Sequence, residues 1–235
     1  MLRIEHLTKT YDSRKAVDDL TLHIAPGEVY GFIGLNGAGK TTTLKSVAGI
    51  LQFDSGEIYV AGKSVREDPT ACKTIMAYIP DNPDLYDFMT GTQYLNFVGD
   101  IFGVSTQKRK ERIGKYAEIF GLTADLDQSV SSYSHGMKQK LAVISAWMHE
   151  PKLILMDEPF VGLDPKASHS LKEMMRELCD EGGAISSPPT CWTWRKSCVT
   201  KLPLSKKESS SVPEPWKRLR VTNPWRKPSW NWRRM

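Results

Sequence analysis

The sequence predicts an α/β fold: a predominantly parallel sheet, preceded by an antiparallel β subdomain and interrupted by an inserted α-helical subdomain. Apolar and polar residues alternate over the first thirty residues, which favours antiparallel strands. Short apolar runs then alternate with helical patterns, as in a layered α/β core. From about residue 85 to 150, apolar residues instead recur three and four apart, which indicates helices.

The core elements follow from their local patterns. Buried strands are expected where short apolar runs are bounded by turn residues, at 29–33, 57–61, 75–79 and 152–156. A glycine-rich loop follows the first of these runs, and a helix with spaced apolar residues follows the loop. A second amphipathic helix is expected at 167–179, closed by Gly182 and Gly183.

Composition indicates an ordinary globular chain. The 235 residues are 40% hydrophobic and 25% charged. The longest apolar run, Leu141 to Met148, is far below the roughly 20 residues that a membrane helix needs. Charges near the N-terminus argue against a secretory signal, so we expect a cytoplasmic protein with reduced cysteines. If the protein acts at a membrane, it must dock on a partner that spans it.

The glycine-rich loop predicts a phosphate site. Its eight residues match GxxxxGK[ST] and lie between a predicted strand and a predicted helix, as a P-loop NTPase (RecA-like) core requires. Its backbone amides and the following helix N-terminus would cradle phosphates, Lys40 would reach the β and γ phosphates, and Thr41 would bind Mg²⁺. The alternative is a glycine-rich turn with a chance lysine. The predicted ATP-binding residues here are Gly34, Leu35, Asn36, Gly37, Ala38, Gly39, Lys40, Thr41 and Thr42.

Two acidic residues close the predicted strand at 152–156. A buried strand that delivers a carboxylate at its C-terminal edge suits a magnesium ligand, so Asp157 is predicted to hold Mg²⁺ through water. Glu158 is predicted to polarise the attacking water as the general base, with Lys40 as the second catalytic residue. Alone, the pattern also fits a strand followed by a solvated acidic turn.

Further motifs carry a family resemblance. Residues 131–140 (SSYSHGMKQK) look like the signature of ABC ATPases, and Val161 to Pro165 (VGLDP) look like the D-loop that follows the acidic strand. Tyr11 resembles the aromatic residue that stacks on adenine. Over residues 1 to 185, with the motifs in family order, the chain resembles the ATP-binding subunit of an ABC transporter.

The resemblance implies an assembly. Two ATPase domains, in a homodimer or in paired subunits, would pack head to tail with each ATP between the P-loop of one and the signature of the other. The signature residues Ser134, His135, Gly136 and Met137 would contact the partner's ATP, and Asp164 would lie in the D-loop. The ATPase would power a separate transmembrane permease, placing it on the inner face of the cell membrane. No specific nucleic acid is expected.

Two positions depart from the family pattern. His135 stands where the signature usually has its first glycine, which adds bulk beside the γ-phosphate. Asp81 stands where the family has a glutamine that touches Mg²⁺. Since a carboxylate can bind hydrated magnesium, Asp81 is predicted as a further metal ligand.

The composition changes near Ile185. Residues 1–185 contain 20 Lys/Arg and 25 Asp/Glu, whereas 186–235 contain 12 and 2, with six of the seven Trp. We therefore expect an ATPase domain at 1–185, with its helical subdomain at about 85–150, and an aberrant, disordered basic tail at 186–235. Pro188 and Pro189 argue against a core strand after Ile185.

A single-base frame slip would explain this tail. The family has a strand and a switch histidine here, but no histidine follows His169. Reading the same codons out of frame allows LFSTHVLDVAEKLCDKVAIIKKG, which resembles the missing strand, histidine and helix. Two other functions stay open: a nucleotide-binding but hydrolysis-deficient fragment, and a soluble ABC ATPase that acts on ribosomes or nucleic acid.

Overall fold

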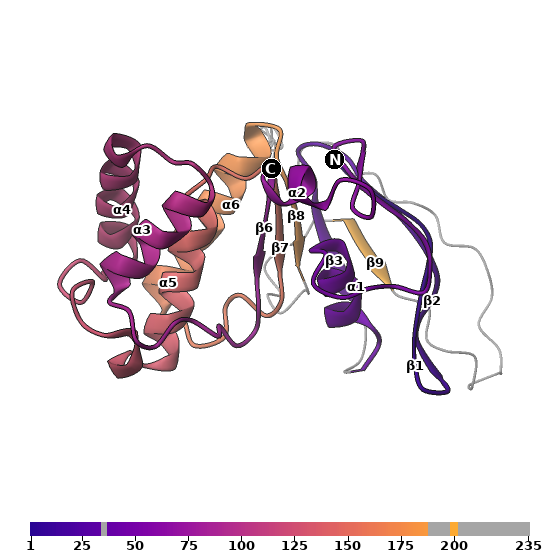
Figure 1. Cartoon of the computed structure of the whole chain (residues 1–235), viewed down its shortest axis with the longest axis horizontal. Coiled ribbons are helices and arrows are strands. Elements are labelled where there is room, and N and C mark those ends of the chain that lie inside the picture. The colour runs from indigo at the N-terminus through magenta and orange to yellow at the C-terminus, as the bar shows by residue number, and fades with distance from the viewer. Residues whose placement is uncertain (34–36, 188–197, 202–235) are drawn as a thin grey trace, which may run out of the picture.

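The structure, a computed structural model, describes residues 1–33, 37–187 and 198–201. Figure 1 shows a parallel sheet between a group of helices on one side and a long antiparallel hairpin on the other. This arrangement confirms the predicted α/β fold with an antiparallel β region and a helical region. No helix of the described residues is long and apolar enough to cross a membrane.

The antiparallel sheet has the order β2-β1-β4-β5. Along β1, Leu2, Ile4 and Leu7 are buried while intervening residues are more exposed, so the predicted alternation places one face on the core. Its strands are β1 (Leu2–Tyr11), β2 (Arg14–Ile24), β4 (Ser55–Val60) and β5 (Lys63–Ser64).

The parallel sheet has the order β6-β7-β8-β3-β9. All four residues of β7 are buried, as expected of a strand covered on both faces. Ile154 and Met156 belong to the core beneath the helices, whereas Leu153 and Leu155 belong to the core beneath the antiparallel sheet. The strands are β3 (Val29–Ile33), β6 (Met76–Ile79), β7 (Leu153–Met156), β8 (Ala184–Ser187) and β9 (Cys198–Lys201).

Most of the described helices start at a side-chain cap, whereas α1 starts at Gly39 without one. Thr90 and Gln93 form a capping box at α3, and Ser105, Ser134 and Asp164 cap α4, α5 and α6. The helices are α1 (Lys40–Val47), α2 (Pro69–Lys73), α3 (Gly91–Ile101), α4 (Thr106–Phe120), α5 (His135–Trp147) and α6 (Pro165–Asp180), with a 3₁₀ turn at Val130–Ser132.

The prediction that no core strand continues past Ile185 is wrong. Strand β8 extends through Ser186 and Ser187, which are buried between β7 and β3. Pro188 comes directly after the last residue of β8 in the sequence. Strand β8 therefore continues two residues past the predicted boundary at 185.

A short strand lies within the range predicted as the tail, and the disorder of that tail stays a prediction. Cys198–Lys201 pairs in parallel with β3, in the register Tyr30↔Cys198 to Ile33↔Lys201, because the outer edge of β3 offers free main-chain groups to a further strand. The remainder of the predicted tail, 188–197 and 202–235, lies outside the described residues, together with the region where the switch histidine was expected.

Candidate functional site

A cleft of about 670 Å³ lies between the antiparallel hairpin, the start of α1 and the C-terminal ends of β6 and β7. It brings together predicted site residues from four separate segments of the chain. Those that line it are Tyr11, Gly37, Ala38, Gly39, Lys40, Thr41, Thr42, Asp81, Asp157 and Glu158. Gly34, Leu35 and Asn36 lie outside the described residues.

The phosphate loop is fixed by close backbone packing. Gly39, the N-cap of α1, has a φ of 82°, a left-handed conformation that favours glycine. A Cβ atom added at Gly39 would lie 2.2 Å from the carbonyl oxygen of Ala16 in β2. Gly39 is therefore needed both for its backbone angle and for the approach of the hairpin, and it leaves the first amides of α1 facing the cleft.

The Thr41 hydroxyl and the Asp157 carboxylate contact each other in the cleft. Thr41 Oγ1 donates a hydrogen bond of 2.5 Å to Asp157 Oδ2, and Asp157 is only 3% exposed. The Asp157 amide donates to the Ile79 carbonyl at 2.8 Å, which anchors the end of β7 to β6. The two oxygens that were predicted to share magnesium thus lie side by side, and oxygen donors are the ones that Mg²⁺ prefers.

Glu158 follows directly and has an unusual backbone. Its φ of 52° lies in the left-handed region, although it is not a glycine. Such strain is concentrated at functional sites, where the surrounding structure holds it in place. The strained backbone turns the chain at the end of β7 and leaves the partly exposed Glu158 in the wall of the cleft.

Tyr11 also lines the cleft and is 47% exposed. The Lys9 ammonium lies 5.6 Å from the centre of the Tyr11 ring and also pairs with Asp54 at 3.0 Å. The hydrogen bond from Lys9, followed by that from the Thr10 amide, holds the pKa of Asp54 below its ordinary value. The aromatic ring is therefore available at the cleft, with a cation beside it.

The signature segment lies apart from the cleft. Ser134 caps α5 by accepting from the Met137 amide at 3.3 Å, and Ser134 and His135 are exposed. A Cβ added at Gly136 would lie 2.4 Å from the Gly162 carbonyl oxygen, so the start of α5 packs directly on the D-loop. The signature thus presents a helix N-terminus at the surface instead of completing the cleft of its own chain.

Helix α5 also holds the segment that follows Glu158. Gln139 Nε2 donates to the Pro159 carbonyl at 3.4 Å, and Lys140 Nζ lies 2.6 Å from Asp164 Oδ2. Asp164 accepts from the Ala167 amide at 2.8 Å. The hydrogen bond from Lys140, then that from Ala167, lowers the pKa of Asp164. The signature helix and the loop that carries the candidate base are therefore one packed unit.

Sequence reasoning missed two cleft residues, Arg14 and Ala16. The signal was present, because Asp12 and Ser13 between two alternating segments suit a two-residue hairpin turn that returns the chain beside Tyr11. The β-bulge that admits Ala16, between the pairs Lys9↔Val17 and Thr10↔Lys15, has no such signature.

A glycine-rich loop that opens a helix beside an acidic strand end, in a parallel sheet, defines a P-loop nucleoside triphosphatase domain. The family model described as "ABC transporter" matches residues 17–161, so the chain belongs to the ABC transporter family.

The relatives come from curated proteins and solved structures. The chain is 38% identical over 178 residues to the uncharacterized ABC transporter ATP-binding protein YxlF of Bacillus subtilis (strain 168), covering 76% of this chain and 59% of that protein. It is 34% identical to the ABC-type transporter ATP-binding protein EcsA of the same organism, covering 79% of this chain and 75% of that protein. A solved structure of the ATP-binding subunit of an ABC transporter superposes with a TM-score of 0.81 at 33% identity, covering 86% of this chain and 85% of that one. Against several of the curated relatives the chain spans about three fifths of their length.

Proposed function

We propose that this protein is the ATP-binding and ATP-hydrolysing subunit of an ABC transporter. The observation that carries the proposal is the convergence of Lys40, Thr41 and Asp157 on one cleft that Tyr11 also lines. This lining suits a nucleotide whose base would stack on Tyr11 while its phosphates would lie on the amides that open α1. Lys40 would balance the charge of the β and γ phosphates.

The oxygens of Thr41 and Asp157 would also suit a magnesium ion. Thr41 and Asp157 offer two adjacent oxygens, and Asp81 offers a third at the cleft wall. No cluster of three His, Cys, Asp or Glu side chains able to hold a metal occurs within 1–33, 37–187 and 198–201. This donor set suits Mg²⁺, which usually keeps several waters and takes one or two carboxylates together with substrate phosphates. When bound, the ion would neutralise charge that develops on the phosphates.

Hydrolysis would use Glu158 as the general base. Glu158 follows the proposed magnesium ligand Asp157 in sequence and lines the same cleft. A water between Glu158 and the γ-phosphate would lose its proton to the carboxylate as its oxygen attacks phosphorus, while the bond to the β-phosphate breaks. The packing of α5 on the segment from Pro159 to Asp164 would hold Glu158 in position.

The exposed N-terminus of α5 supports pairing with a second ATPase domain. Ser134, His135, Gly136 and Met137 would meet the nucleotide bound by that partner, where helix amides and the Ser134 hydroxyl suit a γ-phosphate. Loss of this phosphate on hydrolysis would open the pair and move an attached permease. Such an ATPase would work on the inner face of the membrane through that permease.

Two substitutions test the site. Lys40→Ala is expected to abolish measurable ATP binding by calorimetry in Mg²⁺ buffer, whereas Lys45→Ala, a control later in α1, should bind as the wild type does. Glu158→Gln should keep ATP affinity but lose hydrolysis and accumulate an ATP-bound dimer. If Glu158→Gln hydrolyses ATP at the wild-type rate, its assignment as base is wrong.

One observation favours a hydrolysis-deficient alternative. No histidine is among the described residues that line the cleft, whereas the family resemblance implies a histidine near the γ-phosphate. Wild-type protein that binds Mg-ATP tightly but releases no phosphate would support this alternative. Reading the coding DNA for a one-base slip near Ile185 tests the cause. Related chains that carry the same tail in frame would contradict the frame slip.

A further inference from the structure

We infer that Arg14 is a further nucleotide-binding residue, whose guanidinium contacts the ribose and α-phosphate portion that ATP and ADP share. The inference rests on the proposed ATP-binding function and deepens it. It assigns to the antiparallel hairpin a second role besides carrying the aromatic residue at the cleft.

The hairpin places Arg14 next to Tyr11. The two residues are cross-strand partners at the tip of the β1–β2 ladder, joined by the two-residue turn of Asp12 and Ser13. Cross-strand partners have Cβ atoms about 5 Å apart, so the Arg14 side chain starts beside the ring that would stack on the base. Both residues line the cleft.

The hairpin is also fixed to the phosphate loop. Ala16 occupies a β-bulge in β2, and its carbonyl approaches Gly39 so closely that an added Cβ would lie 2.2 Å away. Arg14 lies two residues before this contact. Its backbone is therefore held between the expected base position at Tyr11 and the phosphate loop, which is where a bound nucleotide has its ribose and α-phosphate.

The balance of charge in the cleft suits a role for the Arg14 guanidinium in binding phosphate. The charged residues that line it are Lys40, Arg14, Asp81, Asp157 and Glu158, so Lys40 and Arg14 are the positive ones among the described lining residues. Lys40 sits at the start of α1, at the phosphate end of the cleft. A triphosphate carries more negative charge than Lys40 and one Mg²⁺ neutralise, and Arg suits phosphate oxygens through its forked donors.

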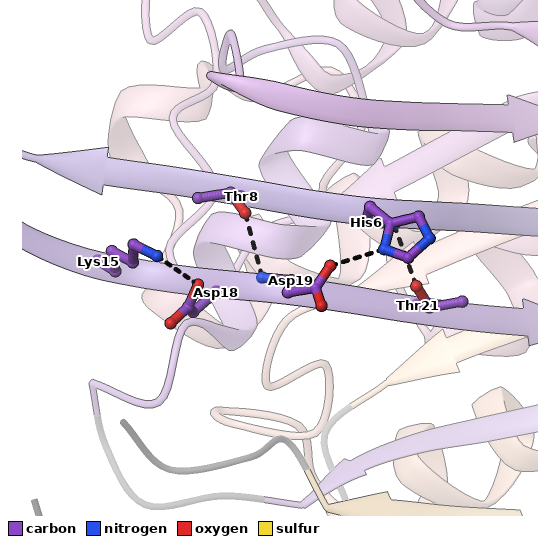
Figure 2. Close-up of polar contacts among 6 residues, drawn as sticks. All are labelled: His6, Thr8, Lys15, Asp18, Asp19 and Thr21. Atoms are coloured by element: carbon purple, nitrogen blue, oxygen red, sulfur yellow. Dashed lines mark hydrogen bonds and ion pairs between the residues drawn. The ribbon is translucent and has the colours of Figure 1, made fainter. Parts of the chain in front are cut away.

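Neighbouring cations on the hairpin already have carboxylate partners. Lys15 forms an ion pair with Asp18 (Figure 2), in which Nζ lies 2.7 Å from Oδ1. Arg3 Nε lies 3.4 Å from Glu5 Oε1. Arg14 forms no ion pair within 4.0 Å in the part of the chain that the structure describes, and its side chain is exposed. Its guanidinium can therefore turn to a ligand without first breaking an ion pair.

The test compares Arg14→Ala with Lys15→Ala by calorimetry in Mg²⁺ buffer. Lys15 is the matched control, because adjacent strand residues point to opposite faces and Lys15 is not among the cleft residues. We expect Arg14→Ala to weaken the binding of both ATP and ADP about tenfold, which corresponds to the loss of one solvent-exposed charged hydrogen bond. Lys15→Ala should change neither affinity by more than about twofold. Arg14→Lys should recover part of the affinity.

The outcomes separate the two proposals. Wild-type protein that binds neither nucleotide would contradict the proposed function itself. If the wild type binds but Arg14→Ala keeps the affinity for both nucleotides within about twofold, or Lys15→Ala loses as much, the role of Arg14 is refuted. A loss confined to ATP would also overturn the assignment, because it would place the guanidinium at the γ-phosphate.

Discussion

Lys140 Nζ lies 2.6 Å from Asp164 Oδ2 and so joins α5, the helix of the predicted signature, to the N-cap residue of α6. The lysine side chain is 17% exposed and the aspartate 48%. Asp164 lies in the predicted D-loop, on which Gly136 also packs. A movement of α5 would therefore be transmitted to the loop that begins at Glu158 and lines the cleft.

Asp164 has two stabilising roles that substitution can separate. Asp164→Asn removes the charge of the ion pair but keeps a good helix cap, so we expect a loss below about 1 kcal/mol in the free energy of unfolding. Asp164→Ala removes the cap as well and should cost about 1 kcal/mol more. Urea unfolding of both variants measures this difference. Equal losses would mean that the hydrogen bond to the Ala167 amide contributes nothing.

Gly37 and Gly39 form a matched pair for the phosphate loop. Both have a φ of 82°, so alanine at either position should cost about 1 kcal/mol of backbone strain. An added Cβ meets nothing within 4 Å at Gly37, but lies 2.2 Å from Ala16 O at Gly39. We expect Gly39→Ala to cost at least about 2 kcal/mol more, because the hairpin must move.

Thermal and urea unfolding, followed by calorimetry with Mg-ATP, compare these two alanine variants. Gly39→Ala should also weaken nucleotide binding, since the hairpin carries Tyr11 and Arg14. Similar unfolding free energies for Gly37→Ala and Gly39→Ala would show that the hairpin shifts at little cost in free energy. That result would contradict a tight contact between Ala16 and Gly39.

Sequence patterns could place most of the scaffold, because local physics determines it. The apolar run at 29–33 forms β3 with those bounds, and the three-and-four spacing between 85 and 150 forms α3, α4 and α5. The expected phosphate and acidic motifs meet in one cleft because the C-terminal ends of parallel strands share a sheet edge.

Contacts between distant segments could not be predicted in the same way. Ser186 belongs to β8 because it pairs with both β3 and β7, and Ser187 because it pairs with β3. The polar sequence around these two serines gives no sign of that pairing. The bulge at Ala16 and the packing of Gly136 on Gly162 depend on backbone atoms that come together only in the fold. Arg14 was overlooked because a lone arginine on a strand has no distinguishing motif.

His149 predicts a pH-dependent stability. Its ring stacks on Phe102 with centroids 3.7 Å apart, and its Nε2 lies 3.2 Å from the Met76 carbonyl oxygen. Burial, together with the charge of Arg112, lowers the pKa of His149 from 6.5, although the Met76 contact opposes the shift. The folded state therefore disfavours the proton more than the unfolded chain does.

The sign of the pH effect follows from this lowered pKa. Stability from neutral His149 is fully present above pH 6.5 and is lost as the pH falls through the lower folded-state pKa. Urea unfolding at pH 7.5 and 5.5 should show a smaller unfolding free energy at pH 5.5 for the wild type. His149→Gln should reduce that difference, and an unchanged difference would exclude His149 as its source.

Two buried cysteines should resist alkylation in the native protein. Cys179 is 6% exposed, and burial, followed by the charge of Asp180, raises the pKa of its thiol to about 12. Cys72 is 0% exposed, and burial likewise raises its pKa. Because the thiolate is the nucleophile, both should react with iodoacetamide far more slowly at pH 8 than in the unfolded chain.

Peptide mapping by mass spectrometry measures the extent of alkylation at each cysteine separately, so modification of Cys191 and Cys198 does not affect the values for Cys72 and Cys179. Native protein should show little modification at Cys72 and Cys179, and protein in 8 M urea should show full modification at both. Cys179 packs in the core shared by α6 and the helical region, and its thiol lies 3.9 Å from the Glu28 carbonyl oxygen. Rapid modification of Cys179 alone in the native protein would therefore mean that α6 separates transiently from the sheet. Such a separation would also displace Asp164, the N-cap residue of α6, which pairs with Lys140 of α5.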